Sequence, residues 1–388
     1  MNFLTIAAHT TIALSFLLLC GCTAVKTVVH NFADLDDYRI FANRAIPNSQ
    51  RPSPLKTLAR VPGFIVELRV PDENGATWAL DRYLDDTKTA AFVVLQDDRI
   101  VYERYGRGFD DRSLLNSFSI AKSIVGTLVG IALSDGKISS VDAAVEDYLP
   151  EFSGTAYGDV TIRSLLTMTS GRADAPSLLP GRAQYYYGDD LHAVTAGALP
   201  EAQQGSHWRY SEADVQMLGF VLEAATGMTV SEYLAEKLWK PLGMESEALW
   251  ALDHEGGSEK TFCCISARAR DFARFGRLYL DHGRWNGEQV VPAKWIDRAV
   301  LPGVATHDGY VHQHLWWTPQ GGQGDFYAYG HNGQYVYVNP QTRVVIVKFS
   351  ETNRQDPVPM FRAVAGALKS PERIAELDRL AAQTVALR

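Results

Sequence analysis

One long apolar helix constrains this chain more than any other feature. Residues 119–134 place apolar side chains on nearly every side of a helix with 3.6 residues per turn. Such a helix must be buried all round, and Asp135-Gly136 follows it as a stop. Ser119 and Lys122 are three residues apart, so both side chains leave the same face of its first turn. Because loss of water lowers the pKa of an amine, we expect Lys122 to act as a general base beside the Ser119 hydroxyl.

The Ser-x-x-Lys spacing is not specific by itself, because it occurs three times in the chain. The copy at residues 53–56 contains proline in a polar stretch, and the copy at 134–137 lies in a turn. Only residues 119–122 open an apolar helix. The alternative for this copy is an ordinary helix N-terminus with a surface lysine.

Length and composition indicate a folded globular body. The chain has 388 residues, of which 46% are hydrophobic and 21% charged, and this allows two sub-domains around a large core. The formal net charge of -8 leaves no basic surface for a nucleic acid. We therefore expect no nucleic-acid partner.

The first residues are interpreted as an export signal. The apolar run at residues 12–21 is shorter than the roughly 20 apolar residues that a transmembrane helix needs. It ends in LCGC at residues 19–22, which resembles a bacterial lipobox whose last cysteine receives the lipid. We expect a lipoprotein signal peptide at residues 1–21, a lipid on Cys22, and an exported protein anchored in the outer membrane and facing the periplasm. The positive charge usual before such a run is missing, and an uncleaved N-terminal anchor is the alternative.

The two remaining cysteines, Cys263 and Cys264, are adjacent. Consecutive Cα atoms are about 3.8 Å apart, which is below the usual range for a disulfide. We expect two small buried residues. The chain has no Cys-x-x-Cys spacing of the kind that binds metals.

The pattern along the chain predicts an α+β fold. Residues 22–60 are polar and contain several prolines, as expected of a tether to a folded body at 61–388. Strands are expected near both ends of that body, at residues 91–96, 99–105, 325–330, 334–339 and 343–349. Helices are expected at residues 142–150, 160–171, 214–226, 230–239, 267–280, 292–301 and 358–387, with an irregular loop at 172–206. We therefore expect an antiparallel sheet built from both chain ends, helices on its faces, and a mainly helical lobe at about residues 140–260.

Acyl transfer needs a proton for the leaving group and donors for the oxyanion, and two later segments can supply them. Tyr210 follows the irregular loop and can pass a proton if a nearby cation lowers its pKa; the alternative is a packed tyrosine. At residues 330–334 (GHNGQ) glycine lets the backbone approach a ligand, so the N–H of Gln334 can join that of Ser119 in an oxyanion hole. His331 would orient the site, or is simply a turn histidine.

Two other histidines, His312 and His314, are two residues apart on one strand face. No carboxylate or third histidine has suitable spacing near them. We expect neither a metal site nor a cofactor.

Taken together, the segments resemble the serine β-lactamase/DD-peptidase superfamily, specifically its class C-like hydrolases such as esterases and 6-aminohexanoate-dimer hydrolases. The resemblance covers about residues 90–349, and its motifs are FSIAKS at 118–123, LLTMTSG at 165–171, YSE at 210–212, SARARDFARFG at 266–276 and GHNGQY at 330–335. It implies a DD-peptidase/β-lactamase-like fold and an acyl-enzyme on Ser119, with Lys122 as base and Tyr210 as proton shuttle. The amides of Ser119 and Gln334 would hold the oxyanion.

Two departures from the family pattern bear on the substrate. The tyrosine motif of the β-lactamases and peptidases ends in asparagine, and here that position is Glu212. Their Lys-Thr-Gly motif is here His331, Asn332 and Gly333, so the permanent cation that meets a substrate carboxylate is missing. Both changes disfavour an anionic β-lactam, and Glu212 favours an amine-bearing substrate.

Aromatic residues are candidates for the cleft wall, although such residues are more often core. They are Tyr185, Tyr186, Tyr187, Trp316 and Trp317. The leading interpretation is an exported serine hydrolase of small esters or amides. The alternatives are a peptidoglycan DD-peptidase or weak β-lactamase, and a non-catalytic binding or sensor protein of the same fold.

Overall fold

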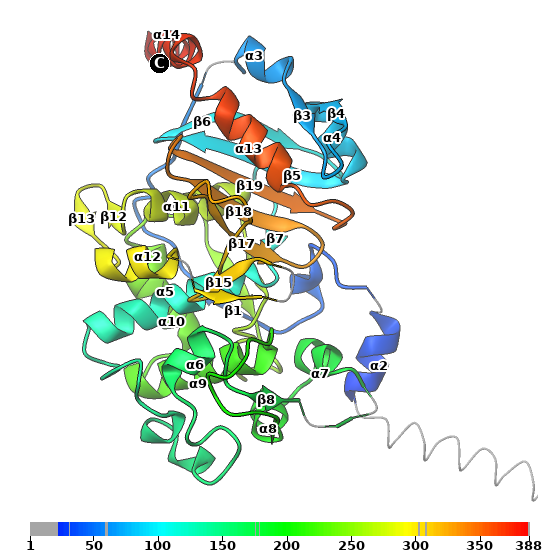
Figure 1. Cartoon of the computed structure of the whole chain (residues 1–388), viewed down its shortest axis with the longest axis vertical. Helices are drawn as coiled ribbons and strands as arrows, with labels where there is room; N and C mark the ends of the chain where they lie inside the picture. Colours follow the sequence, from blue (N-terminus) through cyan, green and yellow to red (C-terminus); the bar gives the residue numbers. More distant parts are fainter. Residues whose placement is uncertain are drawn as a thin grey trace, which may run out of the picture.

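The computed structural model describes residues 22–30, 32–58, 61–174, 176–177, 179–301, 303–306 and 309–386. Figure 1 shows a layered region at one end, in which a large sheet lies between helices, and a mainly helical region at the other end. This is the α+β architecture expected from the sequence.

A nine-stranded sheet joins the two ends of the folded body. Its strand order is β14-β15-β16-β17-β18-β19-β5-β6-β2, antiparallel at every pairing except that of β2 with β6. The strands are β2 (Lys56–Thr57), β5 (Thr89–Gln96), β6 (Arg99–Tyr105), β14 (Val304–Ala305), β15 (Val311–Gln313), β16 (Trp316–Thr318), β17 (Phe326–Gly330), β18 (Gln334–Asn339) and β19 (Val344–Ser350). The pairing of β19 with β5 confirms a sheet assembled from both ends.

Both faces of this sheet are covered, which explains the long apolar runs in its central strands. Val93 and Val347 are paired in register and belong to one core, whereas the next pair, Val94 and Ile346, belongs to the other. The first face packs on α11 (Ala269–Leu280) and α5 (Ile120–Ser134), and the second on α4 (Leu80–Asp86) and α13 (Val358–Ala367). Burial on both sides places β5 and β19 at the centre of the hydrophobic core.

The helical region lies between β7 and β10 in the sequence. Its helices are α6 (Ile162–Leu166), α7 (Gly181–Tyr187), α8 (Leu191–Ala196), α9 (Glu212–Thr226) and α10 (Val230–Leu234). The buried helix α5 packs directly against α9. It therefore connects the sheet to the helical region (Figure 1).

A second, four-stranded sheet holds the residues before the serine. Its order is β1-β10-β11-β7, with β1 (Asn43–Ile46), β10 (Ala248–Ala251), β11 (Ile265–Ala267) and β7 (Leu115–Asn116). The tether expected at residues 22–60 is wrong for much of this stretch: α2 (Cys22–Val29) contacts α7, and β1 pairs with β10. Leu35 and Ile46 are buried in the core, so apolar burial holds the segment on the body.

Several predicted elements differ from the structure. The helix expected at 142–150 is two 3-10 turns, η2 (Val145–Asp147) and η3 (Pro150–Phe152), because the Val145 amide bonds to the Val160 carbonyl. The loop expected at 172–206 contains α7 and α8, the latter capped by the Asp190 side chain. The last helix is divided into α13 and α14 (Pro371–Ala386), since proline starts a helix and cannot continue one.

Short peripheral elements complete the fold. They are η1 (Asp37–Arg39), α3 (Gly63–Val66), β3 (Arg69–Pro71), β4 (Thr77–Ala79), β8 (Arg172–Ala173), β9 (Leu199–Pro200), η4 (Ala235–Trp239), β12 (Arg284–Trp285), β13 (Glu288–Gln289) and α12 (Ala293–Ala299). Among the residues that the structure covers, no helix has the length and apolar character needed to span a bilayer. The predicted signal peptide at residues 1–21 lies outside the described residues.

A buried lysine on β19 gives a prediction about stability. Lys348 is 2% exposed, its amine contacts the Ser350 hydroxyl, and burial lowers its pKa to about 7. In the unfolded chain this amine stays protonated up to about pH 10. Its cost to folding is therefore largest below pH 7 and shrinks as the pH rises toward that of the unfolded amine.

Lys348→Met is expected to raise Tm by several degrees at pH 6 and by clearly less at pH 9. The measurement is thermal unfolding at both pH values, with Lys56→Met, at an exposed strand position, as the control. Equal shifts at the two pH values would show that the amine is not the cause.

Candidate active site

The serine follows a strained turn at the start of α5. Phe118 has φ of 44°, a left-handed conformation that is costly for a residue with a side chain. The Asn116 side chain accepts a hydrogen bond from the Phe118 amide at 3.1 Å, and β7, which contains Asn116, is paired with β11. These contacts hold Ser119, which is partly exposed, at the N-terminal end of the buried helix.

Lys122 lies in the first turn of α5 beside the serine, as predicted. Its Nζ is 2.9 Å from the Ser119 Oγ and 2.6 Å from the Phe262 carbonyl oxygen, and the residue is 2% exposed. Burial lowers the pKa of Lys122 to about 8, while Glu212 raises it and Arg182 lowers it. With this pKa about a tenth of the amine is neutral at pH 7, and the lone pair of that form can take the serine proton.

Tyr210 completes the group. The Lys122 Nζ lies 4.8 Å from the centre of the Tyr210 ring. Burial and then the Glu212 charge raise the pKa of Tyr210, and a hydrogen bond with Ser119 lowers it by less. The cation Arg182 does lower this pKa, but the net shift is upward because the loss of water outweighs it. Tyr210 is a neutral phenol, which can accept and donate a proton in one step.

The GHNGQ segment lies against the serine turn. A side chain at Gly330 would meet the Ser117 carbonyl oxygen at 2.3 Å, so glycine permits the close approach of β17 to this turn. His331 is exposed, its ring packs edge-on against Phe118 at 5.7 Å, and partial loss of water and Arg182 lower its pKa. The segment is therefore a direct neighbour of the serine.

The other three residues of this turn make contacts within the protein. The Gln334 side chain is buried and bonds to the carbonyls of His331 and Ser350. The Asn332 amide donates to the Ala33 carbonyl at 3.0 Å, and Gly333 has φ of 83°. These bonds fix the shape of the turn and the position of the Gln334 backbone.

A carboxylate and a guanidinium lie near the Lys122–Tyr210 pair. Glu212, at the start of α9, is half-buried, and its charge acts on both Lys122 and Tyr210. Arg182 on α7 has its Nε 3.7 Å from a Glu212 oxygen and also acts on Lys122 and Tyr210. Nothing in the residue pattern singled out Arg182, because it lies in the stretch expected to be irregular.

The aromatic candidates separate into two groups. Trp316 is buried and stacks on Phe275, away from Tyr210, whereas the ring of Trp317 stacks on Tyr210 at 6.0 Å. Trp208 packs edge-on against Trp317 at 5.7 Å. Sequence reasoning missed Trp208, although it precedes Tyr210 by two residues. Trp316 is therefore a core residue, and it is Trp317 that contacts Tyr210.

The three consecutive tyrosines of α7 also differ from one another. Tyr185 is 1% exposed, whereas Tyr186 is half-buried and packs its ring against Phe118. The Tyr187 hydroxyl donates to the His30 carbonyl. Of the three, Tyr186 reaches the serine turn.

The adjacent cysteines differ from expectation. Both are buried as predicted, but the structure joins Cys263 and Cys264 in a disulfide, so the expectation that they stay unpaired is wrong. Cys264 has φ of 76°, and this turn lets neighbouring residues pair. The pair directly follows Phe262, whose carbonyl contacts Lys122.

The two strand histidines pack on aromatic rings. His312 is buried 5.1 Å from the Trp317 ring, and burial lowers its pKa to about 3. His314 stacks on Trp295 at 4.5 Å. Both therefore contribute to aromatic packing.

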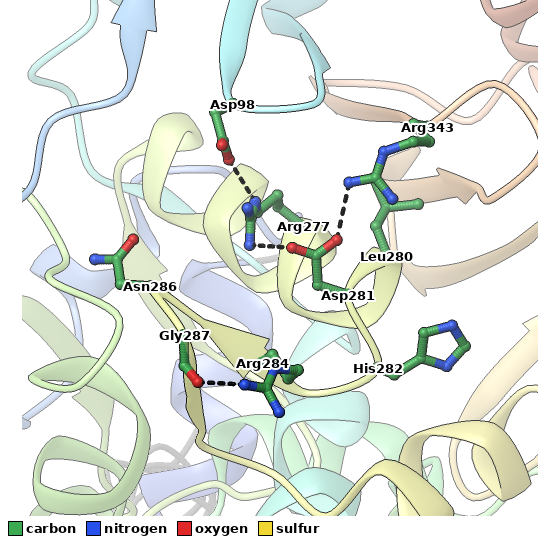
Figure 2. A pocket seen from close by; sticks show the side chains of 9 residues that line it. All are labelled: Asp98, Arg277, Leu280, Asp281, His282, Arg284, Asn286, Gly287 and Arg343. Carbon is green, nitrogen blue, oxygen red and sulfur yellow. Dashed lines mark hydrogen bonds and ion pairs between the residues drawn. The ribbon is translucent and has the colours of Figure 1, made fainter.

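A charged cavity of about 480 Å³ lies elsewhere, at the end of α11 and the β12–β13 turn (Figure 2). Arg277 pairs with Asp98 and Asp281 at 2.7 Å each, and Arg343 pairs with Asp281 at 2.8 Å. These ion pairs neutralise the charges of one another. The residues that line the cavity include none of those around Ser119.

Comparison with known proteins places this geometry in context. The family model for "Beta-lactamase" matches residues 79–369. The 6-aminohexanoate-dimer hydrolase of Paenarthrobacter ureafaciens is 28% identical over 307 residues, covering 73% of this chain and 76% of that protein. A putative D-alanyl-D-alanine carboxypeptidase of Escherichia coli (strain K12) is 28% identical over 181 residues, covering 39% of this chain and 41% of that protein. The structure of a putative 6-aminohexanoate-dimer hydrolase from Bacillus anthracis has a TM-score of 0.77 at 23% identity, covering 86% of this chain and 91% of the other, which shows the same fold.

Proposed function

The chain belongs to the beta-lactamase family and is a serine hydrolase, and we propose that it cleaves small esters or amides through an acyl-enzyme on Ser119. The observation that carries this proposal is the 2.9 Å separation between the buried Lys122 amine and the Ser119 hydroxyl. Tyr210 lies against both groups. A nucleophile, a base and a proton relay are thus in mutual contact.

The proposed reaction has two halves. Neutral Lys122 takes the Ser119 proton as the oxygen attacks the substrate carbonyl, and Tyr210 passes a proton to the leaving alcohol or amine. The backbone N–H groups of Ser119 and Gln334 stabilise the oxyanion. Water then attacks the acyl-enzyme by the reverse proton path, and the acid is released.

The substrate proposal rests on Glu212. This carboxylate lies beside the reacting groups and can pair with an ammonium group of a substrate. The relative from Paenarthrobacter ureafaciens is named for hydrolysis of a 6-aminohexanoate dimer, which carries an amine. We expect small, linear, amine-bearing amides or esters to be preferred.

Glu212→Gln is expected to lower kcat/KM for an amine-bearing ester roughly fivefold, since a partly exposed ion pair contributes about 1 kcal/mol. A neutral ester of the same length should change less than twofold. Both rates are measured at about pH 9, where Lys122 is already mostly neutral and an alkylammonium group of the substrate is still charged. Equal losses on the two esters would contradict an amine-binding role.

The function itself is tested with a fluorophosphonate probe and a panel of p-nitrophenyl esters and anilides. Stoichiometric labelling that disappears in Ser119→Ala supports the hydrolase, and an unlabelled wild-type chain would favour the binding or sensor protein. Faster hydrolysis of a chromogenic cephalosporin than of a short p-nitrophenyl ester would favour the DD-peptidase or β-lactamase alternative.

The location is proposed from the leader at residues 1–21 and from Cys22. The protein is exported and held by a lipid on Cys22 in the bacterial envelope, facing the periplasm. Incorporation of an alkyne fatty acid in the full-length chain, lost in Cys22→Ala, tests this proposal. Incorporation that persists in Cys22→Ala would contradict it.

A further inference from the structure

An N-terminal strap, defined as residues 32–42, crosses both segments of the candidate site. The Leu35 carbonyl accepts a hydrogen bond from the Asn116 amide at 2.8 Å, just before the serine turn. The Ala33 carbonyl accepts from the Asn332 side chain at 3.0 Å, in the turn after β17. The strap therefore touches the chain on both sides of the candidate oxyanion hole.

A line of hydrogen bonds runs from the serine turn to the strap. The Phe118 N–H donates to the Asn116 Oδ1 at 3.1 Å, and the Asn116 Nδ2 donates to the Tyr186 hydroxyl at 3.3 Å. The Tyr186 hydroxyl donates to the Asp37 carboxylate at 2.6 Å. All three hydrogen bonds run in the same donor-to-acceptor direction, and the last acceptor is the Asp37 carboxylate. In such a line each hydrogen bond strengthens the next.

Ring packing follows the same path. The Phe118 ring packs against Tyr186, with ring centres 6.3 Å apart, and edge-on against His331, at 5.7 Å. Tyr186 also packs edge-on against the strap residue Phe41, with ring centres 5.2 Å apart. The strap thus holds Tyr186 by both the hydroxyl and the ring of this tyrosine. Tyr186 in turn contacts Phe118, the residue before Ser119.

Asp37 is 7% exposed, and its carboxylate also accepts from the Asp34 amide at 2.9 Å. Burying a carboxylate is costly unless it is hydrogen-bonded, and these two bonds provide that compensation. The neighbouring Asp36 is instead half-buried, with 44% of its side chain exposed, and pairs with Arg39. The two adjacent acids therefore have different surroundings, which makes them a matched pair for an experiment.

We propose that Asp37 is a positioning residue for the nucleophile, acting through Tyr186 and Asn116 to hold the strained backbone of Phe118. This inference rests on the proposed acyl-enzyme function. The strap is then a working part of the active site, because it sets the direction of the Ser119 hydroxyl toward the carbonyl that it attacks. A small misplacement of a nucleophile lowers the rate far more than it lowers binding.

The test compares Asp37→Ala, Asp37→Asn, Tyr186→Phe, the Asp37→Ala/Tyr186→Phe double variant and the control Asp36→Asn. The readouts are the rate of fluorophosphonate labelling of Ser119, kcat and KM for a p-nitrophenyl ester, and Tm. Asp37→Ala and Tyr186→Phe should each lower the labelling rate and kcat by about tenfold or more, with KM within twofold. The double variant should be no worse than the weaker single variant, because one line of bonds is broken in each. Asp37→Asn should recover most of the rate, since its amide oxygen still accepts from Tyr186.

Three results would overturn the inference: labelling of Tyr186→Phe within twofold of wild type, losses that multiply in the double variant, or an equal loss in Asp36→Asn. Tyr186→Phe keeps the ring packing, so it remains informative if Asp37→Ala fails to fold. A wild-type chain that does not react with the probe would instead refute the proposed function, and the inference with it.

Discussion

Lys122→Met is expected to lower kcat/KM by about a thousandfold, because the variant keeps the apolar stem but loses the base that takes the Ser119 proton. Lys122→Arg should be equally inactive, since a guanidinium stays charged and has no lone pair to offer. The measurement is steady-state hydrolysis of a p-nitrophenyl ester, with Tm to show that both variants fold. Retention of a tenth of the activity in Lys122→Arg would mean that positive charge, and not a free lone pair, is what the reaction needs.

The same amine sets the expected pH profile. Activity requires neutral Lys122, whose pKa is lowered by burial to about 8, so kcat/KM should rise with pH through about 8 and then level off. Glu212 raises this pKa and Arg182 lowers it. Glu212→Gln should therefore move the midpoint to lower pH, and Arg182→Gln should move it to higher pH. Shifts in the same direction for both variants would show that another group governs the profile.

The parts of the fold that depend on local pattern could be predicted from the sequence. The hairpin of β5 and β6, the strands β17 to β19 and the buried helix α5 each have a hydrophobic period that is readable within a few residues. The serine–lysine contact follows from the same reasoning, since a three-residue spacing on a helix brings two side chains together.

The parts of the fold and of the site that depend on partners distant in the sequence could not be predicted. Residues 43–46 form a strand only because β10, some two hundred positions away, pairs with them, and composition alone indicated a tether. The neighbours Trp316 and Trp317 are equally aromatic, and only the face of β16 decides that one stacks on Phe275 and the other on Tyr210. The Phe262 carbonyl that holds Lys122 is a backbone group, which no side-chain motif records.

Tyr210→Phe is expected to lower kcat for an amide by about a hundredfold or more, because the leaving amine must receive a proton that only the lost hydroxyl delivers. A p-nitrophenyl ester should lose at least tenfold less, since p-nitrophenolate departs without protonation. The ring still stacks on Trp317 and faces Lys122, so KM and Tm should change little. Tyr329→Phe is the control, because this nearby phenol accepts from Asn353 at 2.7 Å. Equal losses on amide and ester would place Tyr210 in activation of Ser119, and proton delivery to the leaving group would then fall to Lys122.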